Sequence, residues 1–292
     1  MHYEGPIFRP PIEANSLLLQ VTVGCAHNKC TFCNMYQPVC FRKEPLEQIE
    51  EDLREARSTH RKVERVFLVN GDAFVLKADY LKAIALKVKE YLPECNTITM
   101  YASVRNIMSK TDEELKELRA LGINDLYLGI ESGWNDVVVH INKGWTIPEA
   151  KEQAQRLRKA NINWMASFML GIAGKGLGEE NAKANAEFLN EAKPNKIWFG
   201  TLAVFEGTKL YEEVEAGTFV EPSEKENLLE MKTVIENIKL ENVPFYGVHS
   251  TNVVPVIGTL PIDKEKMLQA LDAGIKKLGE EKLSKTFRRT SL

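Results

Sequence analysis

Apolar and polar positions alternate in blocks along most of this chain. Short runs rich in apolar and β-branched residues are separated by longer charged segments in which apolar residues recur every three or four positions. Several of the short runs are apolar almost throughout, which is typical of parallel strands that are covered on both faces. Six runs are therefore predicted as strands, at Ser16–Val23, Arg65–Asn70, Thr97–Ala102, Asp125–Ile130, Asn163–Leu170 and Lys196–Val204.

The longer charged segments have the period of amphipathic helices. In one of them Ile49, Leu53 and Ala56 fall at i, i+4 and i+7, which predicts one buried stripe. Thr111 and Thr146 are each followed three residues later by a glutamate, the pattern of a capping box at the start of a helix. Helices are predicted at Pro45–His60, Ala78–Leu92, Thr111–Leu121, Thr146–Ala160 and Gly178–Glu191.

Six strands that alternate with helices predict an α/β fold, a partial (β/α)6 TIM-like barrel with parallel strands. Periodicity does not give the strand order, so an open doubly wound sheet is the alternative. In both arrangements ligands bind at the carboxyl ends of the strands. We expect residues 1–220 to form this core domain.

The pattern changes after residue 220, and residues 221–292 are expected to form a C-terminal extension packed on the core. A long amphipathic helix is predicted at Pro222–Leu240 and a last helix at Asp263–Leu278. The stretch Pro244–Pro261 contains three prolines and is predicted to be a loop.

Composition and charge exclude some classes of function. The 292 residues are 44% hydrophobic and 27% charged, with a net charge of −3, so nothing favours a nucleic-acid partner electrostatically. No apolar run approaches the length of a membrane span, and the N-terminus lacks the pattern of a signal peptide. Three of the five cysteines are clustered, which fits a metal site in a reduced cytoplasm better than a disulfide framework.

The clustered cysteines are Cys25, Cys30 and Cys33, spaced C-x4-C-x2-C directly after the first predicted strand. Three thiolates on one loop can ligate three irons of a [4Fe–4S] cluster and leave the fourth iron without a protein ligand. A structural zinc site is the alternative, because His27 would complete a set of three cysteines and one histidine.

The cysteine loop followed by six βα units resembles the radical S-adenosylmethionine (SAM) superfamily, over roughly residues 12–220. The resemblance implies that Cys25, Cys30 and Cys33 hold a [4Fe–4S] cluster whose fourth iron chelates SAM. One electron then cleaves SAM to methionine and a 5′-deoxyadenosyl radical, which abstracts a substrate hydrogen. The family's commonest spacing is C-x3-C-x2-C, and the extra residue here places His27 beside the cluster, as a substitute ligand or as a hydrogen-bond donor.

The residues at the strand ends match further positions of this family. Lys143 and the stretch Glu206–Tyr211 point to its coproporphyrinogen-oxidase-like and methylthiotransferase-like members. A zwitterionic ligand needs a carboxylate for its amine and a cation for its carboxylate, and these strand ends carry both. The implied SAM contacts are Phe32, Gly171 and Gly174 for the adenine, Gly71 and Asp72 for the amine, Glu131 for the ribose, and Lys143 or alternatively Arg105 for the carboxylate, with Ser103 beside Arg105.

The resemblance implies a radical SAM enzyme acting on a small-molecule or peptide substrate, with flavodoxin or ferredoxin as electron donor. It leaves the reaction open among decarboxylase, oxidase and mutase types, and we expect no nucleic-acid or membrane partner. The stretch His249–Asn252 is either a substrate contact or a surface loop. The alternative function is a non-catalytic protein in which zinc or an iron–sulfur cluster stabilises the fold.

Overall fold

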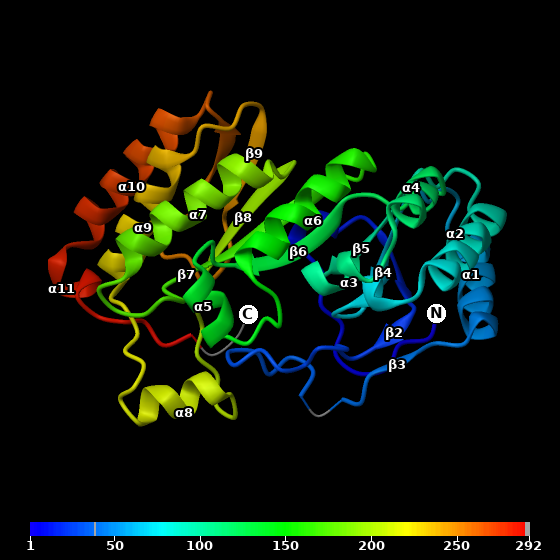
Figure 1. The fold of residues 1–292 in the computed structure, drawn as a ribbon, viewed down its shortest axis with the longest axis horizontal. Coiled ribbons are helices and arrows are strands. Elements are labelled where there is room, and N and C mark those ends of the chain that lie inside the picture. The colour runs from blue at the N-terminus through cyan, green and yellow to red at the C-terminus, as the bar shows by residue number, and fades with distance from the viewer. Residues whose placement is uncertain (38, 290–292) are drawn as a thin grey trace. The chain divides into compact units, whose positions relative to one another are not determined.

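The computed structural model describes residues 1–37 and 39–289, and these form an α/β fold (Figure 1). Within them a mainly parallel eight-stranded sheet has the order β1-β4-β5-β6-β7-β8-β9-β10, and β10 runs antiparallel to β9. Its strands are β1 Leu17–Gln20, β4 Arg65–Val69, β5 Thr97–Ala102, β6 Leu126–Glu131, β7 Trp164–Leu170, β8 Lys196–Thr201, β9 Val243–Gly247 and β10 Val256–Leu260.

The five helices predicted between the strands are confirmed as α1, α2, α4, α6 and α7. Short helices α3, α5 and α8 were not predicted, because five to seven residues are too few to display a helical period. The helices are α1 Leu46–Thr59, α2 Ala78–Tyr91, α3 Val104–Met108, α4 Asp112–Ala120, α5 Asn135–His140, α6 Ile147–Lys159, α7 Gly178–Ala192, α8 Lys209–Glu215, α9 Glu224–Asn237, α10 Lys264–Leu278 and α11 Glu280–Leu283, and two 3-10 turns lie at Pro11–Glu13 and Ala73–Val75.

The chain forms two compact units. Unit 1 comprises Met1–Asn28, Met35–Leu128 and Gln155–Trp164, and unit 2 comprises Lys29–Asn34, Gly129–Ala154 and Met165–Leu292. The chain therefore passes from one unit to the other within the cysteine loop and just after it, and again within β6, α6 and β7. The expected division into a core of residues 1–220 and an extension of residues 221–292 stays a prediction.

In unit 1, β4 pairs in parallel with β1 on one side and β5 on the other. Helices α1 and α2 lie side by side (Figure 1), and the predicted stripe of Ile49, Leu53 and Ala56 is fully buried, which confirms that expectation. Burial of such a stripe removes apolar surface from water, which stabilises the fold by about 25 cal/mol per Å² of buried apolar surface.

The first predicted strand is wrong as a single element. It divides at Val21 into β1 and a short strand β2 (Thr22–Val23), which pairs antiparallel with β3 (Arg42–Lys43) in a separate two-stranded sheet. The N–H of Val21 donates to Val69 at 3.0 Å, while its carbonyl accepts from Glu44 at 2.9 Å. Val21 thus bonds to β4 through its N–H and to the residue after β3 through its carbonyl. The chain leaves the large sheet at this residue and continues through β2 into the cysteine loop.

In unit 2, β8 pairs in parallel with β7 and β9, and three phenylalanines stack across these strands. The ring centroids of Phe168 and Phe199 are 5.0 Å apart, and those of Phe199 and Phe245 are 5.4 Å apart. Helices α7 and α9 lie side by side in the same unit (Figure 1).

The predicted loop Pro244–Pro261 is wrong, because it contains β9 and β10. Prolines in a sequence favour a loop, since proline cannot donate to a ladder. Pro244 nevertheless lies within β9 opposite Thr259, and Pro261 comes directly after the last residue of β10. In β9 the buried residues Val243, Phe245 and Gly247 alternate with partly exposed ones, which is the period of a strand. The prolines make this period hard to recognise in the sequence.

Candidate functional site

The first part of the cysteine loop, with Cys25, belongs to unit 1. Gly24 has a φ of +75°, and a Cβ there would lie 3.2 Å from the carbonyl oxygen of Val39, so the loop begins with a turn that favours glycine. Asn28 also has a positive φ, and its side-chain amide donates to the carbonyl of Tyr36 at 2.9 Å. These contacts hold the half-buried Cys25 on a fixed turn.

The second part, with Cys30 and Cys33, belongs to unit 2 and is tied to two helices. The N–H of Thr31 donates to Ile141 at the end of α5 at 3.1 Å, and its carbonyl accepts from Leu210 of α8 at 2.8 Å. The N–H of Cys33 donates to the carbonyl of Cys30 at 3.2 Å, which closes a tight turn. Both thiols are therefore carried by a segment with fixed backbone.

Helix α8 explains the stretch Glu206–Tyr211 that the sequence singled out. Thr208 is the N-cap of α8, since its hydroxyl accepts from the N–H of Tyr211 at 3.1 Å. This cap begins the helix just before Leu210, whose N–H donates to the carbonyl of Thr31 between the two cysteines. In this unit the stretch therefore anchors the loop that carries two of the cysteines.

A lysine lies beside these two cysteines. The ammonium of Lys143 donates to Glu131 Oε1 at 3.1 Å and lies 6.0 Å from the centroid of the Phe32 ring. Burial lowers the pKa of Lys143, but the negative charges of the Glu131 carboxylate and of the Cys30 and Cys33 thiolates outweigh that effect and raise it. The structure thus brings together Cys30, Phe32, Cys33, Glu131 and Lys143, all predicted from the sequence.

The carboxylate of Glu131 is folded back onto its own strand. Glu131 has a φ of +66°, and a Cβ on Gly129 would lie 2.3 Å from its Oε1, so this conformation needs glycine at position 129. The sequence predicts that Glu131 and Lys143 contact different parts of SAM, yet here they pair with each other. Their separate roles stay predictions.

The two glycines after β7 form a turn in unit 2. Gly171 has a φ of +80°, and a Cβ there would lie 2.7 Å from Asn227 Oδ1 and 2.8 Å from Pro222 Cγ. The N–H of Gly174 donates to the carbonyl of Gly171 at 3.1 Å. Gly171 is thus required by the packing of α9 and the residues before it, whether or not a base also approaches this turn.

In unit 1, Gly71 and Asp72 follow β4. Asp72 is buried, with 4% of its surface exposed, and precedes the turn Ala73–Val75. Gly71 lies under the ring of Tyr36, because a Cβ there would come within 2.4 Å of Tyr36 Cε2. Close packing of an aromatic ring on backbone explains glycine at this position.

The substitution Gly71→Ala is expected to lower the free energy of unfolding by about 1–3 kcal/mol, because the new methyl group overlaps a buried ring. Gly200→Ala is the matched control, since a Cβ there meets atoms at 3.5 Å or more. Urea unfolding of both variants measures the difference. Equal stability of the two would show that the Tyr36 ring moves aside without cost.

Ser103 and Arg105 also lie in unit 1, Ser103 as the N-cap of the short helix α3 and Arg105 within it. The hydroxyl of Ser103 accepts from the N–H of Asn106 at 3.3 Å and so caps this helix. Arg105 is exposed. The SAM contacts of both residues stay predictions.

Lys110 is a residue of unit 1 that the sequence did not single out. It is buried, and its ammonium donates to the carbonyls of Phe74 at 2.6 Å and Asn106 at 3.2 Å, and lies 4.2 Å from the Phe74 ring centroid. It therefore supports the turn that follows Asp72. A single lysine before the Thr111 cap gives no sign of burial in the sequence.

Lys110 is expected to make stability depend on pH. Burial lowers its pKa from 10.5 to about 8, although Glu114 and Asp72 oppose the shift. Between these two values the unfolded chain binds the extra proton, so stability rises with pH in that window. Wild type should gain about 3.5 kcal/mol relative to Lys110→Met as the pH rises through this window, at about 1.4 kcal/mol per pKa unit. Unfolding measured at several pH values tests this, and a difference that does not vary with pH would contradict it.

The cysteines fit an iron–sulfur site chemically. A nearby ammonium favours the thiolate form, which is the form that binds iron, and Cys25, Cys30 and Cys33 are half-buried rather than enclosed. Among residues 1–37 and 39–289, no three His, Cys, Asp or Glu side chains are grouped closely enough to hold a metal ion. Cys25 belongs to unit 1 and the other two to unit 2, so the set of three ligands stays a prediction.

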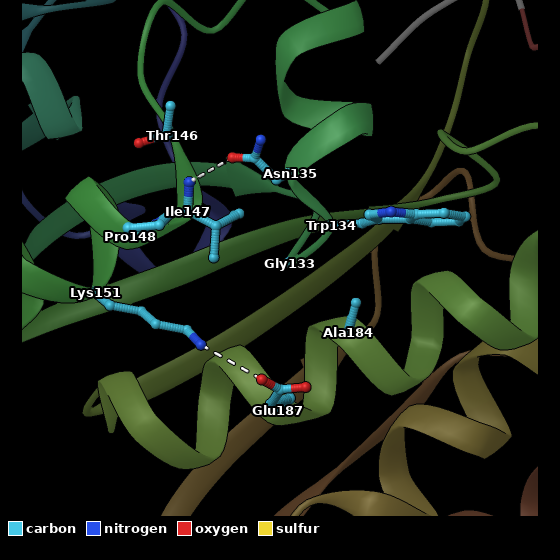
Figure 2. A pocket seen from close by; sticks show the side chains of 9 residues that line it. All are labelled: Gly133, Trp134, Asn135, Thr146, Ile147, Pro148, Lys151, Ala184 and Glu187. Atoms are coloured by element: carbon cyan, nitrogen blue, oxygen red, sulfur yellow. Dashed lines mark hydrogen bonds and ion pairs between the residues drawn. The ribbon is translucent and has the colours of Figure 1, made fainter.

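A pocket of about 360 Å³ lies elsewhere in unit 2 (Figure 2). Lys151 points toward Glu187 across it, with 3.5 Å between ammonium and carboxylate, and Asn135 accepts from the N–H of Ile147 at 3.1 Å. None of the predicted SAM contacts lines it. Its lining residues are Gly133, Trp134, Asn135, Thr146, Ile147, Pro148, Lys151, Ala184 and Glu187.

Comparison with known proteins gives a family match and several distant relatives. Residues 19–189 match the family model described as the radical SAM superfamily. The heme chaperone HemW of Buchnera aphidicola is 22% identical over 210 residues, which are 69% of this chain and 53% of that protein. An uncharacterized methyltransferase of Pyrococcus horikoshii is 25% identical over 191 residues, which are 65% of this chain and 40% of that protein. The chain thus spans about half the length of the curated relatives it matches.

Among solved structures, that of methylornithine synthase (PylB) is similar with a TM-score of 0.55 and 14% sequence identity. The similarity covers 88% of this chain and 68% of that one. At this identity the likeness concerns the fold alone, and it confirms the predicted partial-barrel α/β class. No helix among the described residues is both long and apolar enough to cross a lipid bilayer.

Proposed function

The chain belongs to the radical SAM superfamily, as its cysteine loop and strand ends predict, and we propose that it is an enzyme that binds one [4Fe–4S] cluster and one SAM. Its substrate is a small molecule or a peptide from which hydrogen is abstracted. The observation that best supports this is the group of Cys30, Cys33, Glu131 and Lys143 in unit 2, where a cation lies beside two thiols.

In this proposal Cys25, Cys30 and Cys33 ligate the cluster. When bound, the cluster would supply the single electron needed to cleave SAM to methionine and the 5′-deoxyadenosyl radical that abstracts hydrogen. The chain's own residues bind and orient SAM. Asp72 accepts from its amino group, and Glu131 accepts from the ribose hydroxyls.

Lys143 is proposed to bind the carboxylate of SAM. An ammonium has three N–H donors, and a bond to Glu131 uses one of them. The same lysine can therefore hold Glu131 in place and bind a second carboxylate, so the ion pair and the proposed SAM contact are compatible. Arg105 of unit 1 is the competing cation for the same role.

The remaining proposed contacts are Phe32, Gly171 and Gly174 for the adenine, Gly71 for the amine and Ser103 at the end of β5. Flavodoxin or ferredoxin is proposed as electron donor and the cytoplasm as location, in keeping with cysteines that serve a metal site. The heme chaperone and methyltransferase names belong to the relatives that carry them. The reaction of this chain is open among the types that begin with hydrogen abstraction.

Anaerobic reconstitution tests the proposal. The purified chain should bind about four irons, and with dithionite and SAM it should release 5′-deoxyadenosine and methionine in equal amounts. A colourless protein that retains stoichiometric zinc would favour the non-catalytic alternative. Full reconstitution of iron without SAM binding or cleavage would overturn the proposed function.

A further inference from the structure

Glu230 of α9 is a carboxylate buried in unit 2, with 2% of its surface exposed. Its Oε2 accepts from the N–H of Gly171 at 2.9 Å, and its Oε1 accepts from the side-chain amide of Asn181 at 2.7 Å. Burial raises the pKa of Glu230 to about 7, although these two hydrogen bonds oppose the shift. A buried carboxyl group lowers stability unless it is well bonded, so this position calls for an explanation beyond packing.

The hydrogen bonds continue from Glu230 to the end of β6. Asn181, fully buried on α7, accepts through Oδ1 from the hydroxyl of Ser132 at 2.6 Å. The hydroxyl oxygen of Ser132 in turn accepts from the N–H of Trp134 at 2.9 Å. The chain Glu230–Asn181–Ser132 therefore joins the turn at Gly171 to the corner directly after Glu131.

Both ends of this series of hydrogen bonds meet backbone that has little conformational freedom. Gly171 cannot accept a side chain, because Asn227 and Pro222 fill the space of a Cβ. A Cβ at Gly133 would lie 2.3 Å from the carbonyl oxygen of Ala184. The N–H of Gly133 donates to Asn185 Oδ1 at 2.5 Å. Small shifts of α9 or α7 would therefore be transmitted directly to both strand ends.

We propose that Glu230 is a positioning residue for SAM, which fixes the Gly171 turn and the Glu131 corner relative to each other through Asn181 and Ser132. The proposal rests on the proposed function, since these two strand ends are its adenine and ribose contacts. It assigns a role to α9, whose sequence shows only an amphipathic helix. In this proposal Glu230 acts through Gly171 and Asn181, since it is buried and bonds to both.

The direction of each hydrogen bond allows a reciprocal test. Asn181→Asp places a second carboxylate against that of Glu230 and removes the donor between them. In the double variant Asn181→Asp/Glu230→Gln the glutamine amide donates to the new carboxylate at position 181, and its oxygen accepts from Gly171. That carboxylate still accepts from Ser132. The total charge then equals that of wild type, so the double variant should restore the chain.

Two measurements are made on each protein. Hydrogen exchange of the cluster-free chain reports the amides of Gly171 and Trp134, and equilibrium dialysis of the reconstituted chain reports the Kd for SAM. Asn181→Asp should speed exchange at both amides and raise the Kd at least about ten-fold, as is typical for residues that orient direct ligands. The double variant should return the Kd to within about three-fold of wild type, since the hydrogen bonds are restored in reverse. Glu236→Gln, an exposed glutamate of the same helix, should change neither measurement.

Each outcome decides. Faster exchange with an unchanged Kd would overturn the positioning role and leave the proposed function intact, as would a double variant that fails to recover. If Asn181→Asp does not fold, Glu230→Gln and the double variant carry the same comparison, with the single variant expected to bind SAM more weakly than the double. A wild-type chain that binds iron but no SAM would overturn the proposed function, and this inference with it.

Discussion

Replacement of Cys33 by alanine is expected to abolish both stable cluster binding and release of 5′-deoxyadenosine. A site-differentiated [4Fe–4S] cluster needs three thiolates, and two leave a second iron without a protein ligand. The Cys30–Cys33 turn is fixed by its own hydrogen bond and by bonds to α5 and α8, and Cys30, the other thiol of this segment, is itself a proposed ligand. Iron content after anaerobic reconstitution and the deoxyadenosine assay measure the effect.

Two variants control this experiment. Cys40→Ala removes an exposed cysteine outside the motif and should leave iron content and SAM cleavage unchanged. His27→Ala tests the extra residue of the loop, and retention of about four irons would exclude histidine as a required ligand. If Cys33→Ala keeps a full cluster, the proposed set of ligands is wrong.

The second large effect is expected at Lys143. Its side chain is 11% exposed and that of Glu131 13%, so Lys143→Met leaves a carboxylate largely buried without its ammonium. Loss of one partner of a buried pair costs about 3–5 kcal/mol, and we expect the unfolding free energy to fall by about 3 kcal/mol. The Kd for SAM should rise at least about ten-fold, because its carboxylate loses a charged donor.

The double variant Glu131→Gln/Lys143→Met tests the stability effect by itself. It has no uncompensated charge, so it should regain most of the unfolding free energy, while SAM binding stays weak because both proposed contacts are lost. Lys183→Met removes an exposed i,i+4 pair with Glu179 and should have little effect on either. Normal SAM affinity in the Lys143→Met protein would transfer the carboxylate role to Arg105 or to another group.

What the sequence determined by itself are the features with a local cause. The stripe of Ile49, Leu53 and Ala56 is buried as its period indicates, and Thr111 caps α4 with Glu114 as its spacing indicates. Hydrophobic period and capping act within one or two turns of chain, so a single sequence reveals them. The cysteine spacing led to the family for the same reason, because its residues are neighbours along the chain.

Tertiary structure alone decided which polar groups are buried and which partners they take. In the sequence Glu230 and Lys110 look like solvated charges. Both can be buried because distant segments supply partners: the carbonyl of Phe74 accepts from Lys110, and the N–H of Gly171 and the side-chain amide of Asn181 donate to Glu230. Glu131 and Lys143 were both expected, but their pairing depends on Gly129 and a positive φ. Such contacts depend on packing between residues far apart in the sequence, so local sequence patterns do not predict them.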